Sequence, residues 1–196
     1  SRHPSSPHRS PTVPKSKKAV TLANINLMVQ QLNRYWGRSK RIWVTEYGYQ
    51  TGAYGVTQQR QAELIGQSGL RAHKAARVDM LIHYLVKDEP EASRFQSGLF
   101  NISGRPKLAA LAFPLPIAQA GRSSAKLVLW GQVRPRGGVQ SYRVQVRAGG
   151  AWRFSGSTRR TSARGFFSTA VAAPAGASIR IYSPRDRAYS AAIRAR

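Results

Sequence analysis

The chain has 196 residues, 41% of them hydrophobic, and its 32 basic and 7 acidic residues give a formal net charge of +25. This length allows one good hydrophobic core or two small ones, and no apolar stretch is long enough to span a membrane. The absence of cysteine excludes disulfides and thiolate metal sites, and the four histidines lack metal-ligand spacing, so neither a metal nor a cofactor is predicted.

Residues 1–20 are rich in Pro, Ser, Arg and Lys, a composition typical of a loop or a disordered segment. No secretory signal is visible there, and the sequence begins with Ser1 rather than Met, so we expect a processed product or a fragment.

A helix is predicted from Thr21, which suits the N-cap, to Gly37, which suits the C′ position. Between these two positions, apolar residues recur at helical spacing; they are Leu22, Ile25, Met28, Val29, Leu32, Tyr35 and Trp36. We expect this apolar stripe to pack on a sheet.

The next stretch, Arg41–Thr51, begins as an apolar, β-prone run and predicts a buried strand. Because side chains alternate along a strand, we expect Ile42, Val44 and Glu46 on one face, with the carboxylate at the strand's end. An ionised carboxylate is costly to bury without partners, so Glu46 is either a functional group or the partner of an arginine. Tyrosines in the loop that follows suit either a sugar-binding cleft or packing beneath the loop.

A second helix is predicted from Thr57 to about Ala76, followed by a strand over residues 78–85. The alternation of helix and strand favours a parallel sheet. After the second strand, Asp88 and Glu89 are expected in a solvated turn. Residues 107 to about 117 are expected to form a final helix, cut short by Pro114 and Pro116.

Residues 118–124 are expected to form a linker, after which the apolar period changes to two. Even spacing with Gly and Pro turns predicts a small β-sandwich over residues 125–196. Trp130 and Trp152 could form a binding platform or pack in its core. The six predicted strands are Lys126–Val133, Val139–Ala148, Ala151–Gly156, Gly165–Ala172, Ala177–Ser183 and Tyr189–Ala195.

The positive charge is spread along the chain, with 17 basic and 6 acidic residues in 1–117 and 15 basic and 1 acidic in 118–196. Such a surface favours polyanions non-specifically. No zinc finger, RNA-recognition signature or basic zipper is present, so no specific nucleic-acid partner is predicted. Two explanations of the positive charge are therefore kept: a general amino-acid bias of the source proteome, and binding to acidic cell-wall polymers.

Three blocks of the sequence together resemble one enzyme family. Trp43–Thr51 resembles strand seven of clan A glycoside hydrolases, which are (β/α)8 or TIM barrels. Val78–Leu85 resembles strand eight, and Ser97–Lys107 resembles the turn into the last helix. The order and spacing of the blocks agree, and the resemblance covers roughly residues 1–117, only the end of the barrel.

The resemblance implies an α/β plus all-β fold, a partial TIM barrel followed by a small β-sandwich. The implied domains are a loop or disordered segment (1–20), the C-terminal part of a glycoside hydrolase barrel (21–117), a linker (118–124) and the sandwich (125–196). It further implies that Glu46 is the nucleophile of a retaining enzyme acting on polysaccharide or oligosaccharide.

The candidate substrate-binding residues are His3, Tyr47, Tyr49, His83 and Tyr84. His3 is in a His-Pro pair that resembles the one after strand six, but Ser5 stands where an aromatic residue is usual. His83 and Tyr84 stand where the clan often has Trp.

The second catalytic carboxylate is absent from the sequence. A retaining enzyme uses two carboxylates about 5–5.5 Å apart. In this clan the acid/base Glu follows an Asn on strand four, and the chain contains no Asn-Glu pair. We therefore expect a C-terminal fragment of a secreted enzyme, extracellular or cell-wall associated and inactive alone. The alternatives are a non-catalytic carbohydrate- or cell-wall-binding protein and a basic polyanion-binding protein.

Overall fold

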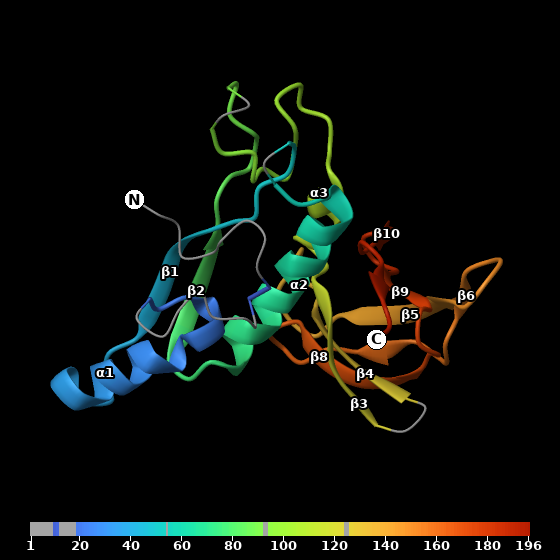
Figure 1. Cartoon of the computed structure of the whole chain (residues 1–196). Helices are drawn as coiled ribbons and strands as arrows, with labels where there is room; N and C mark the ends of the chain where they lie inside the picture. Colours follow the sequence, from blue (N-terminus) through green and yellow to red (C-terminus); the bar gives the residue numbers. More distant parts are fainter. Residues whose placement is uncertain (1–9, 12–18, 54, 92–93, 124–125) are drawn as a thin grey trace. The chain divides into compact units, whose positions relative to one another are not determined.

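The computed structural model describes residues 10–11, 19–53, 55–91, 94–123 and 126–196 (Figure 1). The chain divides into two compact units, residues 1–109 and 110–196. The fold is mixed α/β with several sheets, and the described residues form no closed barrel. Within these ranges no helix has the length and apolar character needed to cross a membrane.

The first unit alternates helices and strands. Its elements are a 3-10 turn (Leu22–Asn24), α1 (Asn26–Trp36), β1 (Ile42–Tyr47), α2 (Gln58–Lys74), β2 (Val78–His83) and α3 (Leu108–Ala112), which runs into the second unit. β1 and β2 pair in parallel, as the alternation predicted. The predicted final helix ends at Ala112; as expected, Pro114 and Pro116 cut it short, because proline cannot continue a helix.

Two helix ends follow the local signals in the sequence, but the predicted N-cap at Thr21 is wrong for α1, which begins at Asn26 after Thr21 has capped the 3-10 turn. The Thr57 side chain accepts a hydrogen bond from the Arg60 backbone N–H at 3.1 Å, as expected of an N-cap. Gly37 ends α1 with φ 66°, a conformation that favours glycine. The prediction that the apolar stripe of α1 packs on the sheet is only partly right, because Tyr35 and Trp36 are 61% and 60% exposed.

The sheet of the first unit is covered on one side only. Apolar residues of β1 and β2 pack with Leu64 and Ala72 of α2 and with Ile25 just before α1. On the uncovered side, Trp43 is 64%, Met80 38% and Ile82 42% exposed. The two-stranded sheet therefore presents an apolar face that no described helix covers.

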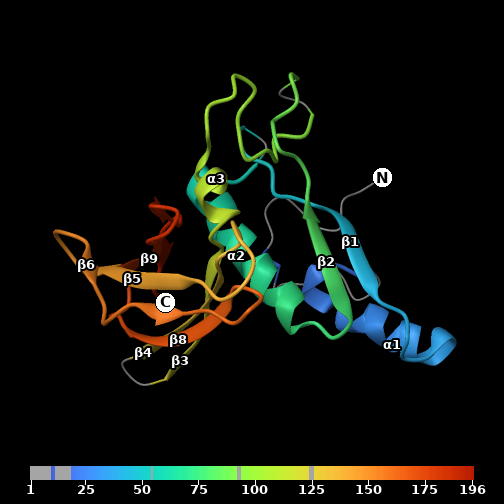
Figure 2. The same cartoon turned by 180° about the vertical axis from the view of Figure 1, so that it is seen from behind.

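The second unit is built from two groups of antiparallel strands around one core (Figure 2). One sheet contains β3 (Ile117–Ser123), β4 (Lys126–Gln132) and β8 (Phe166–Ala172). The other contains β5 (Ser141–Arg147), β6 (Arg153–Phe154), β7 (Arg159–Arg160), β9 (Ser178–Ser183), β10 (Ala188–Tyr189) and β11 (Ile193–Arg194). Buried residues from both sheets, including Leu127, Val144 and Ile179, form the shared core.

The predicted linker at 118–124 is wrong, because β3 occupies most of it. β3 pairs antiparallel with β4 from Ile117 to Ser123. Ile117 and Ala118 are 3% and 2% exposed. The polar tail of β3 suggested a linker, but the ladder with β4 satisfies its backbone and its apolar start enters the core.

Candidate functional site

The candidate site lies at the carboxyl ends of β1 and β2. Tyr47 and His83 are register partners at these ends, and the Tyr84 backbone N–H donates to the Tyr47 carbonyl at 2.7 Å. The segments that follow the two strands leave the sheet at the same end, at the top of Figure 1. The pairing therefore brings together the two blocks that sequence analysis placed at neighbouring strand ends.

Glu46 is exposed near the carboxyl end of β1. The expectation that it shares a face with Ile42 and Val44 is wrong, because the register shifts between Val44 and Tyr47. The shift turns Tyr47 toward the helices, where Ile42 and Val44 also pack. Neighbouring strand side chains point to opposite faces, so Glu46 lies on the side of the sheet that the helices leave uncovered.

The loops behind these strand ends are joined by buried hydrogen bonds. The fully buried Gln61 amide donates to the Tyr49 carbonyl at 2.9 Å and to the Ser97 carbonyl at 3.1 Å. The Thr51 backbone N–H donates to the Gln96 carbonyl at 3.0 Å. A Cβ on Gly48 would lie 2.2 Å from the Tyr84 carbonyl oxygen, so this close approach requires glycine. These contacts fix the loop after β1 against the loop after β2.

A buried ion pair supports the same loops. The Lys107 ammonium lies 2.8 Å and 3.0 Å from the two Asp88 carboxylate oxygens and also donates to Thr51 Oγ1 and to the Gln96 carbonyl, both at 3.1 Å. Burial lowers the pKa of Lys107, while Asp88 acts in the opposite direction. The solvated turn expected at Asp88 is therefore wrong. Adjacent acids suggested exposure, and the partner lies 19 residues further along the chain.

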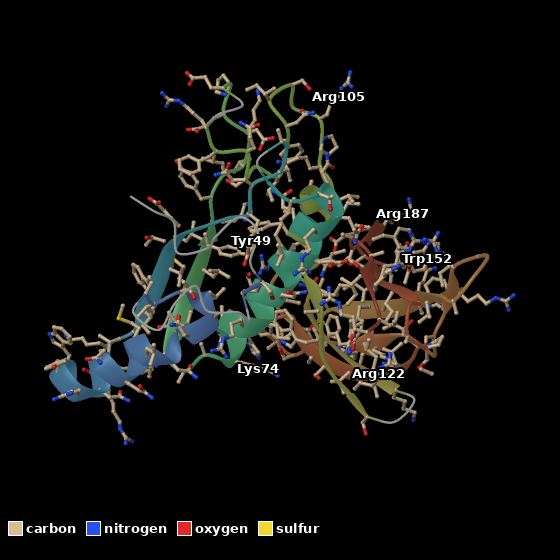
Figure 3. The ribbon with its side chains drawn as sticks, viewed as in Figure 1. Tyr49, Lys74, Arg105, Arg122, Trp152 and Arg187 are labelled. Carbon is tan, nitrogen blue, oxygen red and sulfur yellow. The ribbon has the colours of Figure 1, made fainter. Side chains whose placement is uncertain are left out.

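Two of the predicted substrate-binding tyrosines are buried. The Tyr47 hydroxyl donates to Ser68 Oγ at 2.5 Å on α2, and its ring lies edge-on to Tyr49 with centroids 5.5 Å apart. Tyr49 is 1% exposed, and burial raises its pKa to about 12 (Figure 3). Neither ring has an open face for a sugar, and both pack the strand end onto α2.

The other candidates are placed differently. His83 is half-buried, with Nε2 2.9 Å from the Ser97 carbonyl oxygen. Tyr84 packs edge-on against Phe95 with ring centroids 5.5 Å apart and is also partly exposed. His3 lies outside the described residues.

The remaining acidic side chains of the first unit have structural partners. Glu63 pairs with Arg60, Asp79 with Arg41, Asp88 with Lys107 and Glu91 with Arg94, while Glu89 accepts a hydrogen bond from the Phe95 backbone N–H. Among the described acids of the unit, Glu46 is the one near the carboxyl end of β1. The described residues also gather no group of three potential metal ligands.

The two tryptophans of the second unit have different environments. Trp130 is 4% exposed and belongs to the interior. Trp152, labelled in Figure 3, is half-buried, with the guanidinium carbons of Arg147 and Arg180 at 4.8 Å and 4.2 Å from its ring centroid. From the sequence, each tryptophan could either bind a ligand or pack in the core. The structure places Trp130, but not Trp152, in the core.

Comparisons with known proteins give only weak likenesses. No protein-family model and no curated protein sequence matches the chain. A solved structure of Bacteroides uniformis beta-glucuronidase 2, covalently bound to cyclophellitol-6-carboxylate aziridine, aligns with 11% identity and TM-score 0.41, covering 89% of this chain and 24% of that chain. A crystal structure of Bacteroides uniformis beta-glucuronidase aligns with 11% identity and TM-score 0.40, covering 90% and 24%. The chain spans about a quarter of these enzymes, and likeness at this level carries no conclusion about activity.

Proposed function

We propose that the first unit is the closing portion of a clan A (β/α)8 barrel and that Glu46 is the nucleophile of a retaining glycoside hydrolase acting on polysaccharide or oligosaccharide. The observation that carries the proposal is the position of Glu46 at the carboxyl end of a parallel strand, on the face away from the helices. In such barrels the helices lie outside, and catalytic side chains stand at the carboxyl ends of the strands.

The uncovered face of the sheet supports this proposal. Trp43, Met80 and Ile82 are all more than a third exposed, although they occupy neighbouring strands of one small sheet. In a barrel this face would turn toward the interior, where side chains from the other strands would cover it. The same closure would enclose Glu46 among groups from other strand ends.

The proposed chemistry needs a second carboxyl group. Glu46 would attack the anomeric carbon and form a glycosyl-enzyme, while an acid protonates the leaving oxygen and then activates water. In the first unit the other described acids pair with basic side chains or a backbone N–H, so the acid/base would be supplied by a part of the enzyme other than these 196 residues. The 196-residue chain alone is therefore expected to be inactive.

Supporting roles at the strand ends follow from the geometry. His83 and Tyr84 stay candidates for contact with the sugar, since both are partly exposed beside the end of β1. Tyr47 and Tyr49 would act indirectly, by holding β1 on α2. We also propose that His3 lines the sugar cleft and that the second unit is a β-sandwich. The enzyme would be extracellular or associated with the cell wall, where polysaccharide substrates occur.

The test is a comparison of Glu46→Gln with Glu63→Gln in the product of the longest open reading frame that contains this chain. Hydrolysis of aryl glycosides by the Glu46 variant should fall by several orders of magnitude, because the amide cannot act as the nucleophile. The Glu63 variant should keep near-normal turnover, since that carboxylate pairs with Arg60 on α2. Full activity of the Glu46 variant would contradict the proposal.

A further inference from the structure

The outer face of the β6-β5-β9-β10 sheet carries arginines in consecutive rows. Directly paired residues of antiparallel strands share a face, so the register defines the rows. They are Arg147, Ser178 and Arg194; then Phe154, Gln145 and Arg180; then Arg143, Tyr182 and Tyr189. The alternate residues, Val144, Ile179 and Ile181, lie in the core. The arginine rows therefore face away from the core, at intervals of about 7 Å along the strands.

Aromatic rings hold these guanidinium groups in place. The Arg143 guanidinium carbon lies 3.5 Å from the Phe154 ring centroid. That of Arg180 lies between two rings, 4.2 Å from Trp152 and 4.0 Å from Tyr189. Stacking uses the flat face of a guanidinium and leaves the N–H groups at its edge to donate hydrogen bonds. The rings thus pre-organise the arginines without consuming their donors.

The arginine rows have no internal counter-charge. The only acidic residue between positions 110 and 196 is Asp186, which pairs with Arg136 at 3.2 Å. Gln145 accepts a hydrogen bond from Arg180 Nε at 2.8 Å but is neutral. Arg143 Nε is buried and makes no hydrogen bond among the described residues. Partial burial lowers the pKa of Arg180, as expected for a cation that has lost hydration.

The first row borders an open hollow. Arg147 and Arg194 line a cavity of about 540 Å³, together with the turns Ala148–Gly150 and Pro174–Ala177. Its lining is mostly backbone and cationic side chains. The hollow adds no further cation, but it continues the surface beyond the first row, which suits an extended ligand rather than a single small anion.

We propose that this face, which we call the arginine face (Arg143, Arg147, Arg180 and Arg194 with Trp152, Phe154, Tyr182 and Tyr189), binds a carboxylated polysaccharide. Guanidinium groups match carboxylates in bidentate geometry, and repeated cations along a sheet match a polymer with a carboxylate on successive sugars. The proposal rests on the second unit and does not depend on Glu46.

Single-stranded nucleic acid fits the arginine face less well. Binding of single strands relies on aromatic rings that are free to stack on bases. Here the guanidinium of Arg180 covers Trp152 and Tyr189, and that of Arg143 covers Phe154. The rings are thus committed to arginines, and a ligand with charged edges and no large planar bases is favoured.

The test measures binding of the full chain to polygalacturonate, to its fully methyl-esterified form and to an oligothymidylate by biolayer interferometry at matched salt. The acidic polymer should bind saturably and the ester, which keeps the backbone but loses the charge, should not. Equal binding of the two polymers, or tighter binding of the oligonucleotide, would overturn the proposal.

Paired variants locate the site. Arg143→Gln with Arg180→Gln should weaken binding by about ten- to hundredfold, as expected for lost charge-assisted hydrogen bonds. The control, Lys126→Gln with Arg164→Gln, removes the same charge from exposed positions beside the other sheet and should change binding less than about threefold. Arg143→Lys with Arg180→Lys keeps the charge but loses the planar fork and should also weaken binding. Wild-type affinity in either Arg143/Arg180 double variant, with a wild-type circular dichroism spectrum, would refute the arginine face.

Discussion

At the scale of single residues, the buried Lys107–Asp88 ion pair gives the clearest prediction for stability. Both side chains are almost fully buried, at 3% and 6% exposure. Asp88→Asn would leave the ammonium buried without a counter-charge, which typically costs about 3–5 kcal/mol. We expect the free energy of unfolding of the first unit to fall by this amount. The measurement is a urea titration in which the helical circular dichroism signal reports unfolding.

The Arg41–Asp79 pair is the matched control for that substitution. It also makes a close contact, at 2.6 Å, but its side chains are 55% and 40% exposed. Solvent screens such pairs, so Asp79→Asn should cost much less stability than Asp88→Asn. A similar cost for both substitutions would show that burial is not what makes the Lys107 pair matter.

Tyr49 should make the first unit sensitive to alkaline pH. Its folded pKa of about 12 lies above the ordinary value of 10.0, so the buried neutral phenol contributes stability that is complete below pH 10 and lost as pH rises through 12. The loss should approach about 2–3 kcal/mol. Tyr49→Phe should remove this part of the pH dependence in denaturant titrations between those pH values, and an unchanged slope would contradict the assignment.

Several residue-level predictions depended on local signals and succeeded. Thr57 caps its helix, and Gly37 ends the one before it. The environments of Asp88 and Tyr49 could not be predicted in this way. Their partners, Lys107 and Ser68, are 19 residues away in each case and are reached only through the tertiary fold.

At the scale of elements, the contact between the loops after β1 and β2 depends on Gly48. A Cβ there would lie 2.2 Å from the Tyr84 carbonyl oxygen and 2.9 Å from Ser97 Cβ. Gly48→Ala should therefore force the loops apart and destabilise the first unit by about 1–3 kcal/mol. Gly121→Ala in β3, with nothing within 4 Å of the added atom, is the control in a thermal melt. Equal shifts for the two variants would mean that the loops are free to separate.

Sequence patterns did not predict two features of the strands: the face on which Glu46 lies and the existence of β3. The pattern of β1 predicted a strand and its end, but alternation placed Glu46 on the wrong face. The register shift after Val44 reverses the alternation, and such a bulge leaves no clear mark in the sequence. β3 was missed for a related reason, since its polar residues resemble a linker until β4 pairs with them.

At the scale of the whole molecule, the second unit should fold by itself. Among the described residues, those that form its core cluster all lie between Leu115 and Ala195. Residues 110–196 expressed alone should give an all-β circular dichroism spectrum and a cooperative thermal transition. A spectrum without β structure would show that this core needs the rest of the chain.

The most direct test of the central proposal is covalent trapping at Glu46. The product of the longest reading frame that contains this chain would be treated with a panel of fluorosugar inactivators, which slow the hydrolysis of a glycosyl-enzyme. Peptide mass spectrometry should then find one added sugar on the peptide that contains Glu46, and none in Glu46→Gln. A sugar on any other carboxylate, or turnover of aryl glycosides with no trapped intermediate, would contradict the role of Glu46 as nucleophile.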